Sequence, residues 1–183
     1  TIVSQIPRTR RTWTSNINYF NLDEKSRKEY NKINLSDMNN ETKFAKLTSF
    51  LVSNTNVKKL VLHQLKKLLN KLETTNHKCI IYAKAKEEAD FWSKNLSIPI
   101  YPNKGKHCIV TYHNGTYGIN DLIIYDTIIM RPPNPDTLPQ IKGRLDRPGQ
   151  KSNNLYIEYF ILKDTIEEGL ILRMNIASQF VQK

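Results

Sequence analysis

Apolar and polar positions recur along the chain with two different periods, and this pattern predicts most of its elements. The clearest helix covers residues 57–73, where apolar side chains recur every three or four positions and lysines fill many of the others. Continuous apolar runs at 78–84 and 122–130 are typical of buried parallel strands, because they are short and lack polar alternation. We expect the second run to form one central strand or a pair of strands.

The same pattern predicts further helices and short strands. The strands are expected at 98–101, 107–112 and 156–162. One helix covers 86–96, and a last helix begins at Asp164 or Thr165. Glu167 and Glu168 fall in the first turn of that last helix, where the helix dipole favours carboxylates.

The first 35 residues begin basic and irregular. A short strand at 17–20 then runs into a helix that begins after Asp23, which we predict to cap it. A flexible linker is the alternative for this stretch.

Residues 36–56 are rich in Asn, Ser and Thr, and we expect a connector there with a short helix at about 42–52. The chain is therefore divided into a leading segment with its connector, 1–56, and one domain, 57–183. Strands alternate with helices over most of the chain, which predicts the α/β class: a mainly parallel sheet flanked by helices, with right-handed crossovers.

Length and termini limit the kind of protein. The 183 residues suffice for one domain with a proper core. No apolar run approaches the length of a membrane span, so no membrane partner is expected. The first residue is Thr and nothing resembles a signal peptide, so we expect a piece of a longer chain.

Charge and cysteine content indicate the partner and the compartment. The chain has 28 Lys and Arg against 17 Asp and Glu, a formal net charge of +11. Such an excess favours nucleic acid as a partner, although Lys, Asn and Ile are also abundant in proteins from AT-rich coding sequences. Cys79 and Cys108 fall in predicted buried strands, which indicates core cysteines in an intracellular, reducing compartment without a disulfide or metal framework. The four histidines lack metal-ligand spacing.

The stretch QIKGRLDRPGQ places Arg144 and Arg147 three residues apart, with Gln140 one helical turn upstream. We predict a short helix that begins at Asn134 and ends before Pro148, with residues 140 and 144 on one face. Two guanidiniums at the end of one helix can hold a phosphate through several charge-assisted bonds. A solvated basic helix end is the alternative.

The wider stretch NPDTLPQIKGRLDRPGQ resembles motif VI of superfamily 2 helicases in the form found in Swi/Snf-type ATPases. The positions at that family's spacing are Asn134, Pro135, Gln140, Arg144, Arg147, Gly149 and Gln150. The resemblance implies that Arg147 first, and Arg144 second, act as arginine fingers on the γ-phosphate of ATP. It further implies that Gln140 either orients the nucleotide or links motif VI to its neighbours, and that Gly143 contacts the nucleotide.

TYHNGTYGIND, residues 111–121, resembles motif V of the same family. The positions that fit are Thr111, Gly115, Gly118, Ile119 and Asn120, whereas Asn114 and Thr116 depart from the pattern. A strand that ends in a glycine loop can bring backbone N–H groups close to phosphate. The resemblance implies nucleotide contacts for Gly115, Gly118 and Asn120, and a nucleic-acid contact for Thr111. An ordinary polar turn is the alternative.

Two further stretches concern the nucleic-acid contacts. Residues 78–84 correspond to motif IV, which assigns Lys84 to nucleic acid. In the family, the interval between Ile100 and His107 holds a helix and an arginine that contact the nucleic-acid backbone, and this segment is largely missing. Lys104 and Lys106 are the residues that could supply charge in its place.

The chain contains neither GxxxxGK[ST] nor a DEAH-like acid pair, the signatures that hold ATP and Mg²⁺. It thus resembles a RecA-like helicase C-terminal lobe over residues 57–180. The resemblance implies an N-terminal RecA-like lobe of the same protein as partner, duplex DNA as track, and an inactive isolated chain. A compact lobe and AT-rich composition would suit a helicase of a large DNA virus, in the nucleus or at a viral replication site.

A second hypothesis belongs to a different class. The chain could be a non-catalytic basic nucleic-acid-binding or assembly domain that keeps the fold of a helicase lobe. The short interval between Ile100 and His107 and the altered motif V favour this hypothesis, whereas the intact motif VI argues against it.

Overall fold

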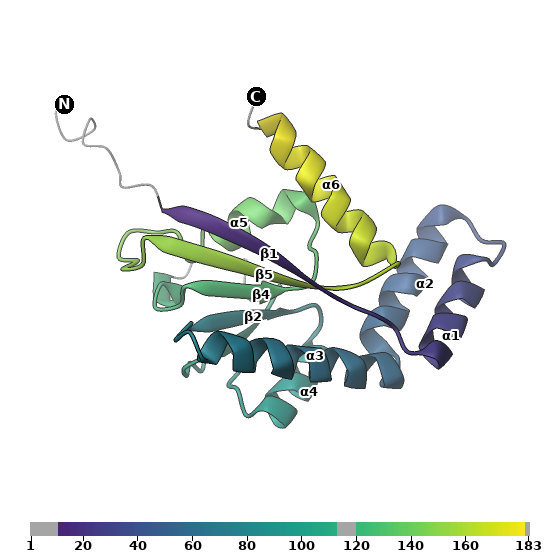
Figure 1. Cartoon of the computed structure of the whole chain (residues 1–183), viewed down its shortest axis with the longest axis horizontal. Coiled ribbons are helices and arrows are strands. Elements are labelled where there is room, and N and C mark those ends of the chain that lie inside the picture. The colour runs from purple at the N-terminus through teal and green to yellow at the C-terminus, as the bar shows by residue number, and fades with distance from the viewer. Residues whose placement is uncertain (1–10, 113–119, 182–183) are drawn as a thin grey trace.

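A five-stranded, all-parallel sheet forms the centre of the computed structural model, which describes residues 11–112 and 120–181. The strands lie in the order β1-β5-β4-β2-β3 (Figure 1). They are β1 (Thr12–Phe20), β2 (Cys79–Ala83), β3 (Cys108–Thr111), β4 (Thr127–Met130) and β5 (Asn154–Leu162). The predicted α/β class with a mainly parallel sheet is therefore confirmed.

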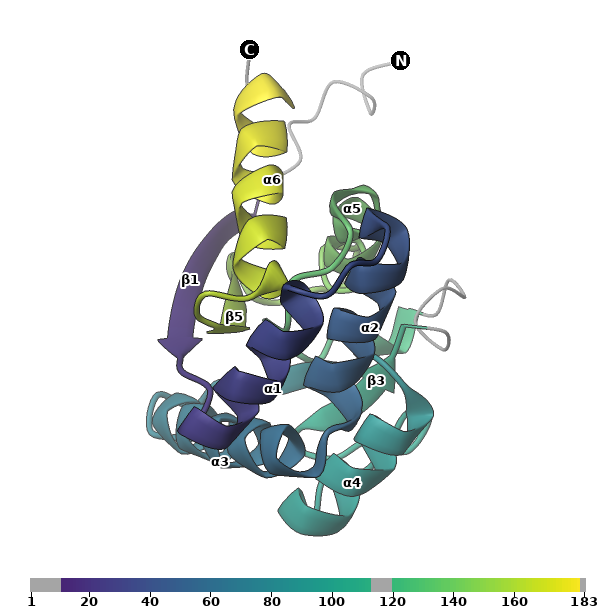
Figure 2. The ribbon, with the colours of Figure 1, turned by 90° about the vertical axis from the view of Figure 1, so that its right-hand side faces the viewer.

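Helices cover both faces of the sheet. They are α1 (Glu24–Asn34), α2 (Asn40–Ser53), α3 (Thr55–Glu73), α4 (Lys86–Leu96), α5 (Leu138–Lys142) and α6 (Ile166–Val181), with 3₁₀ turns η3 (Asn120–Leu122) and η4 (Pro135–Thr137). Helices α3 and α4 lie on one side, and α5 and α6 on the other (Figure 2). Among the described residues, no helix is both long enough and apolar enough to cross a membrane.

The predicted stripe of α3 is the main apolar surface on its side of the sheet. Its buried positions are Val57, Val61, Leu65, Leu68, Leu69 and Leu72. Asn54 begins the helix, because its side chain accepts hydrogen bonds from the backbone N–H groups of Asn56 and Val57. Asp23 caps α1 in the same way through Ser26, as predicted.

The segment before residue 57 contains regular structure. Strand β1 is longer than the predicted 17–20 and pairs along its whole length with β5, from Thr12 opposite Asn154 to Phe20 opposite Leu162. Helix α2 contributes Leu47 and Leu51 to the same core cluster as α3. The flexible-linker alternative, which concerned the first 35 residues, is therefore wrong for residues 12–34, which form β1 and α1. The helix predicted at about 42–52 is α2.

Two predicted strands are shorter than the apolar runs that suggested them. Of 98–101, only Ile100 pairs, through an isolated bridge to Ile109. Of 122–130, only the last four residues form β4, because η3 occupies the start of the run and Ile124 is 54% exposed. Asp126 then accepts a hydrogen bond from the N–H of Lys78 and fixes the point where β4 begins beside β2.

Candidate functional site

The motif VI helix is shorter than predicted. Pro135 stands at the first position of η4, after Asn134, whose side chain makes no capping hydrogen bond. Helix α5 then ends at Lys142, so the expectation that it continues to Pro148 is wrong. After Gly143 the N–H groups of Arg144 and Leu145 bond to the third residue back, and this tight turn places Leu145 in the core with no exposed surface.

The structure separates the three residues predicted to act on ATP. Gln140 is exposed on α5, whereas Arg144 lies in the following turn, so the two do not share a helix face. Arg144 is buried, with 4% of its surface exposed. Arg147 is half-buried, and its Nε donates a 2.6 Å hydrogen bond to the carbonyl oxygen of Gly143.

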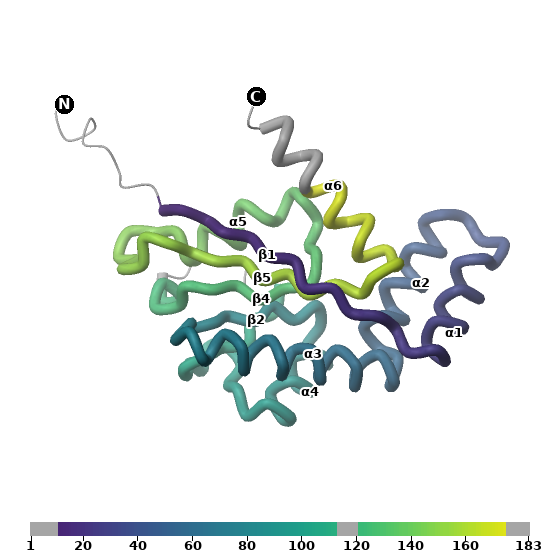
Figure 3. Tube along the Cα trace, in the orientation of Figure 1, coloured from purple at the N-terminus to yellow at the C-terminus, as the bar shows by residue number. Residues whose placement is uncertain are grey.

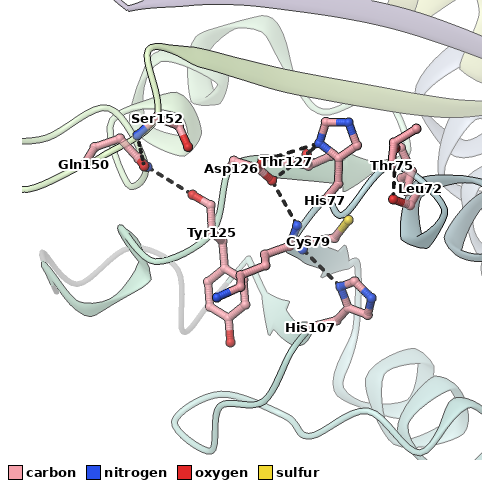
Figure 4. Close-up of polar contacts among 11 residues, drawn as sticks. Leu72, Thr75, His77, Cys79, His107, Tyr125, Asp126, Thr127, Gln150 and Ser152 are labelled. Carbon is pink, nitrogen blue, oxygen red and sulfur yellow. Dashed lines mark hydrogen bonds and ion pairs between the residues drawn. The ribbon is translucent and has the colours of Figure 1, made fainter.

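The end of the motif VI turn is held by Gly149 and Gln150. Gly149 has a backbone φ of +97°, a conformation that residues with a Cβ rarely adopt. The Gln150 amide nitrogen donates to the carbonyls of Tyr125 (3.0 Å) and Leu145 (2.9 Å), and its oxygen accepts from the N–H of Ser152 at 3.1 Å (Figure 4). These bonds connect the turn to the chain just before β4, so the predicted motif residue Gln150 has a structural role.

Asp146 links the motif VI turn to the start of β1, a connection that sequence reasoning missed. Its carboxylate lies 2.8 Å from Nη1 of Arg11 and accepts a 3.2 Å bond from the indole N–H of Trp13. The ammonium of Lys142 lies 5.4 Å from the centre of the Trp13 ring. A basic, irregular stretch gave no sign of this contact, because its partner is more than 130 residues away.

Motif VI crosses one face of the sheet. It begins at the carboxyl edge, where the strands end, and its helix α5 leads toward the opposite edge, as the trace in Figure 3 shows. The bond from Gln150 to Tyr125 lies at that opposite edge, since Tyr125 precedes β4. Motif VI therefore does not lie wholly at the carboxyl ends of the strands.

A cavity of about 430 Å³ opens at the carboxyl edge. The loops after three strands contribute Lys84, Tyr112 and Pro132 to its lining, and α2 and α6 close it with apolar side chains. The hydroxyl of Tyr112 is buried and makes no hydrogen bond to any residue that the structure describes. Burial, and then the nearby Arg131, lower the pKa of the Lys84 ammonium. Lys84 and Thr111 come together here, because Ala83 pairs with Thr111.

An ion cluster lies beneath this cavity. Arg131 is 1% exposed and contacts two carboxylates, Glu167 at 2.6 Å and Glu88 at 3.0 Å, and also donates to the carbonyl of Leu51 at 2.9 Å. Glu167 lies in the first turn of the last helix, as predicted, and only 2% of it is exposed. The cluster therefore fixes the loop after β4 against α2, α4 and α6.

The remaining predicted site residues lie elsewhere. Lys104 forms a 3.0 Å ion pair with Asp121, and Lys106 lines a groove beside α3, so both lie before β3 rather than at the carboxyl edge with Lys84. The motif V glycines, Gly115 and Gly118, lie outside the described residues, as does the side chain of Asn120. In the part of the chain that the structure describes, no group of three or more His, Cys, Asp or Glu side chains could hold a metal ion.

Comparisons with known proteins bear on this geometry. No family model matches the chain. The chain is 59% identical over 182 residues to a protein named "Putative helicase L115" from Acanthamoeba polyphaga mimivirus. That match covers 100% of this chain but spans only 15% of the relative.

Among solved structures, the chain is similar to the C-terminal part of the Fun30 ATPase domain. The TM-score is 0.61 at 15% sequence identity, covering 88% of this chain and 89% of the other. At this identity the likeness establishes the fold, which is that of a RecA-like C-terminal lobe. The predicted resemblance to a helicase C-terminal lobe agrees with both matches: the relative is named "Putative helicase L115" and belongs to a virus, and the shared fold is that of the C-terminal part of an ATPase domain.

Proposed function

We propose that this chain is the second motor lobe of an ATP-dependent nucleic-acid translocase or helicase of the Swi/Snf type. The near-complete match to a segment of a protein named as a helicase, and the fold shared with part of an ATPase domain, support this proposal. In it, an N-terminal lobe of the same protein binds ATP, and this lobe contributes motif V and the motif VI arginines.

The observation that carries the proposal is the built turn around Arg147. The Nε bond to Gly143 orients its side chain, and Gly149 and Gln150 fix the backbone on the far side. A guanidinium held in this way suits the γ-phosphate, because it offers several donors in a planar fork. ATP supplies the phosphoryl group, and an arginine that stabilises its transfer contributes a factor of about 10³ to 10⁵. We assign this role to Arg147.

Mg²⁺ belongs to the partner lobe in this proposal. The described residues present no cluster of carboxylates for it. At the carboxyl edge, Lys84 and Thr111 are adjacent and are proposed to contact the backbone of duplex DNA. The isolated chain is therefore expected to bind nucleic acid without hydrolysing ATP.

One observation favours the second hypothesis, a binding or assembly domain without motor function. Arg144 is 4% exposed, so its charge is used inside this lobe rather than at a surface that another lobe can reach. If both motif VI arginines are structural, they hold the turn together and do not meet ATP. The two hypotheses differ in what removal of Arg147 does.

The test is Arg147→Ala in a protein that contains both lobes. The motor hypothesis predicts that nucleic-acid-stimulated ATPase activity falls by about 10³-fold or more, with poor rescue by Arg147→Lys. Arg173→Ala, an exposed arginine on α6, is the matched control and should keep normal activity. Near-normal activity of Arg147→Ala, or a loss that parallels unfolding, would favour the binding domain.

A further inference from the structure

Helix α3 lies on the side of the sheet away from α5 (Figure 2), and its sequence is strongly basic. Its 19 residues contain five lysines and one glutamate. The outward positions form one ridge, because they recur every three or four residues. The ridge consists of Lys59, His63, Lys66, Lys67, Asn70 and Lys71, all exposed.

The lysines of this ridge are not neutralised by the protein. None of the ammonium groups of Lys59, Lys66, Lys67 and Lys71 forms an ion pair or hydrogen bond within the described residues. The ridge from Lys59 to Lys71 is about 18 Å long at 1.5 Å per residue. A surface helix usually alternates charges of both signs, so this one-sided stretch indicates an acidic partner.

A groove of about 400 Å³ runs along one side of the ridge. Lys66 stands on the α3 wall, and Lys106 on the opposite wall, in the loop before β3. Asn70 and Asn95 add amide groups to the same groove. The arrangement offers two cations and several hydrogen-bond donors on both sides of a channel.

We propose that this groove, walled by Lys66 and Lys106 and continued over the α3 ridge, binds the phosphodiester backbone of a nucleic acid. This site is separate from the motif VI turn, since the sheet lies between α3 and α5. The proposal therefore goes beyond the motor function. It also assigns a nucleic-acid contact to Lys106, which lies before β3 and away from the carboxyl edge.

The chemistry of the groove favours nucleic acid over other acidic partners. Lysines and amides along a channel match a chain of phosphates, which binds through charge and hydrogen bonds without base contacts. A membrane surface would also need large apolar side chains next to the lysines, and the outward positions of α3 carry none. Among the described residues, no Phe, Tyr or Trp lines the groove for base stacking, and His107 is 4% exposed, so we expect binding to the backbone without sequence preference.

The test measures binding of the chain to a fluorescent 20-base-pair duplex and to the matching single strand, over a range of salt concentrations. The variant Lys66→Gln with Lys106→Gln removes one cation from each wall. We expect weaker binding and a salt dependence of log K that is shallower by about two, because each of the two lysines neutralises one phosphate. The two nucleic acids distinguish a duplex from a single-stranded ligand.

The matched control is Lys25→Gln with Lys32→Gln on α1, which removes the same charge from another exposed surface. It should leave the salt dependence unchanged. Equal effects of the two double variants would show that only net charge acts, and would overturn the proposal. Unchanged binding by the groove variant would overturn it too, as would a parent chain that binds polyglutamate but neither nucleic acid.

A variant that removes a negative charge from the groove tests the proposal in the opposite direction. Glu73 is the single carboxylate among the described residues that line the groove, and its side chain is 43% exposed. Glu73→Gln removes this negative charge but keeps an oxygen that can accept the bond from His107. We expect nucleic acid to bind about threefold more tightly. Weaker binding would place the ligand elsewhere.

These measurements use no ATP and leave Arg147 intact, so their outcome is independent of the motor hypothesis. If the groove variants bind normally while Arg147→Ala abolishes ATPase activity in the two-lobed protein, the groove proposal fails and the motor stands. Weaker binding by the groove variants, together with normal ATPase activity of Arg147→Ala, would support the groove proposal and contradict the motor hypothesis.

Discussion

The Nε of Arg131 lies 2.6 Å from a carboxylate oxygen of Glu167, and neither side chain is more than 2% exposed. This pair joins the end of β4 to the first turn of α6, at the base of the cavity at the carboxyl edge. The N–H of Leu162 donates to the other oxygen of Glu167 at 3.0 Å, so the carboxylate is bonded on both sides. Removing one partner from such a buried ion pair destabilises the fold strongly, because the other charge stays buried without compensation.

Arg131→Met should destabilise the fold strongly. The substitution leaves Glu88 and Glu167 buried without their cation, and breaking a buried pair in this way costs about 3–5 kcal/mol. Urea unfolding at pH 7.5 measures the change. Arg173→Met, at an exposed position on α6, should stay within about 0.5 kcal/mol of the parent. A similarly small effect of Arg131→Met would show that the cluster contributes little.

The sequence predicted the elements with strong periodicity but not this cluster. Residues 86–96 form α4 as expected, because their apolar stripe and flanking residues agree on the same limits. In the sequence, Glu167 is recognisable only as a carboxylate in the first turn of a helix, and Arg131 only as a residue before two prolines. Only the parallel order of the strands brings the two together, and that order depends on long-range pairing.

For motif VI, too, the sequence located the segment but did not predict its local structure. The spacing of the family motif located the segment between β4 and β5, yet it did not show where the helix ends. The turn after Gly143 forms because Leu145 is buried on the sheet, and a local pattern contains no information about that packing. Burial of Arg144 follows from the same turn and was likewise beyond the sequence.

His107 should make stability depend on pH. Only 4% of its side chain is exposed. Its Nδ1 accepts a hydrogen bond from the N–H of Cys79 at 3.1 Å (Figure 4). Its Nε2 lies 3.1 Å from a carboxylate oxygen of Glu73. The first bond requires an unprotonated Nδ1, so the ring is neutral. Burial lowers the pKa of His107, although Glu73 opposes the shift.

The direction of the effect follows from that lowered pKa. The unfolded chain, with a histidine pKa of about 6.5, binds the proton more readily than the folded chain. The stabilising contribution is therefore complete above about pH 6.5 and is lost as the pH falls through the folded pKa. Urea midpoints between pH 8 and 5 should fall less steeply in His107→Gln than in the parent. His63→Gln, at an exposed position on α3, should keep the parent slope.

Neither cysteine should react while the protein is folded. Both thiols are buried, and burial raises the pKa of Cys108 to about 11 and that of Cys79 as well. At pH 8 only about one thiol in a thousand would be ionised at a pKa of 11, and the thiolate is the reactive form. Iodoacetamide labelling followed by mass spectrometry should show modification only after unfolding in urea. Rapid labelling of the native chain would contradict this burial.

Gly149→Ala should strain the end of the motif VI turn. The residue has φ +97°, and an added Cβ would lie 2.8 Å from Cδ1 of Ile123. The side chain of Ile123 can move aside, so most of the cost comes from the backbone, about 1–3 kcal/mol. Urea unfolding measures it, and Gly169→Ala, where a Cβ meets nothing within 4 Å, is the control. Equal stability of the two variants would show that the turn tolerates a side chain.

The two motif VI arginines should differ in what their removal does to this lobe. Arg144 is 4% exposed among buried side chains, so Arg144→Ala opens a cavity and removes a buried charge from its surroundings. We expect it to lower the free energy of unfolding by about 3 kcal/mol. Arg147 is half-buried, and Arg147→Ala should cost about 1 kcal/mol or less, mainly through the bond to Gly143. Urea unfolding of the two variants of this chain, without ATP or a second lobe, measures the difference. A large destabilisation by Arg147→Ala would mean that Arg147 stabilises the fold. Any fall in ATPase activity of the two-lobed variant would then follow from unfolding rather than from a missing guanidinium at the γ-phosphate.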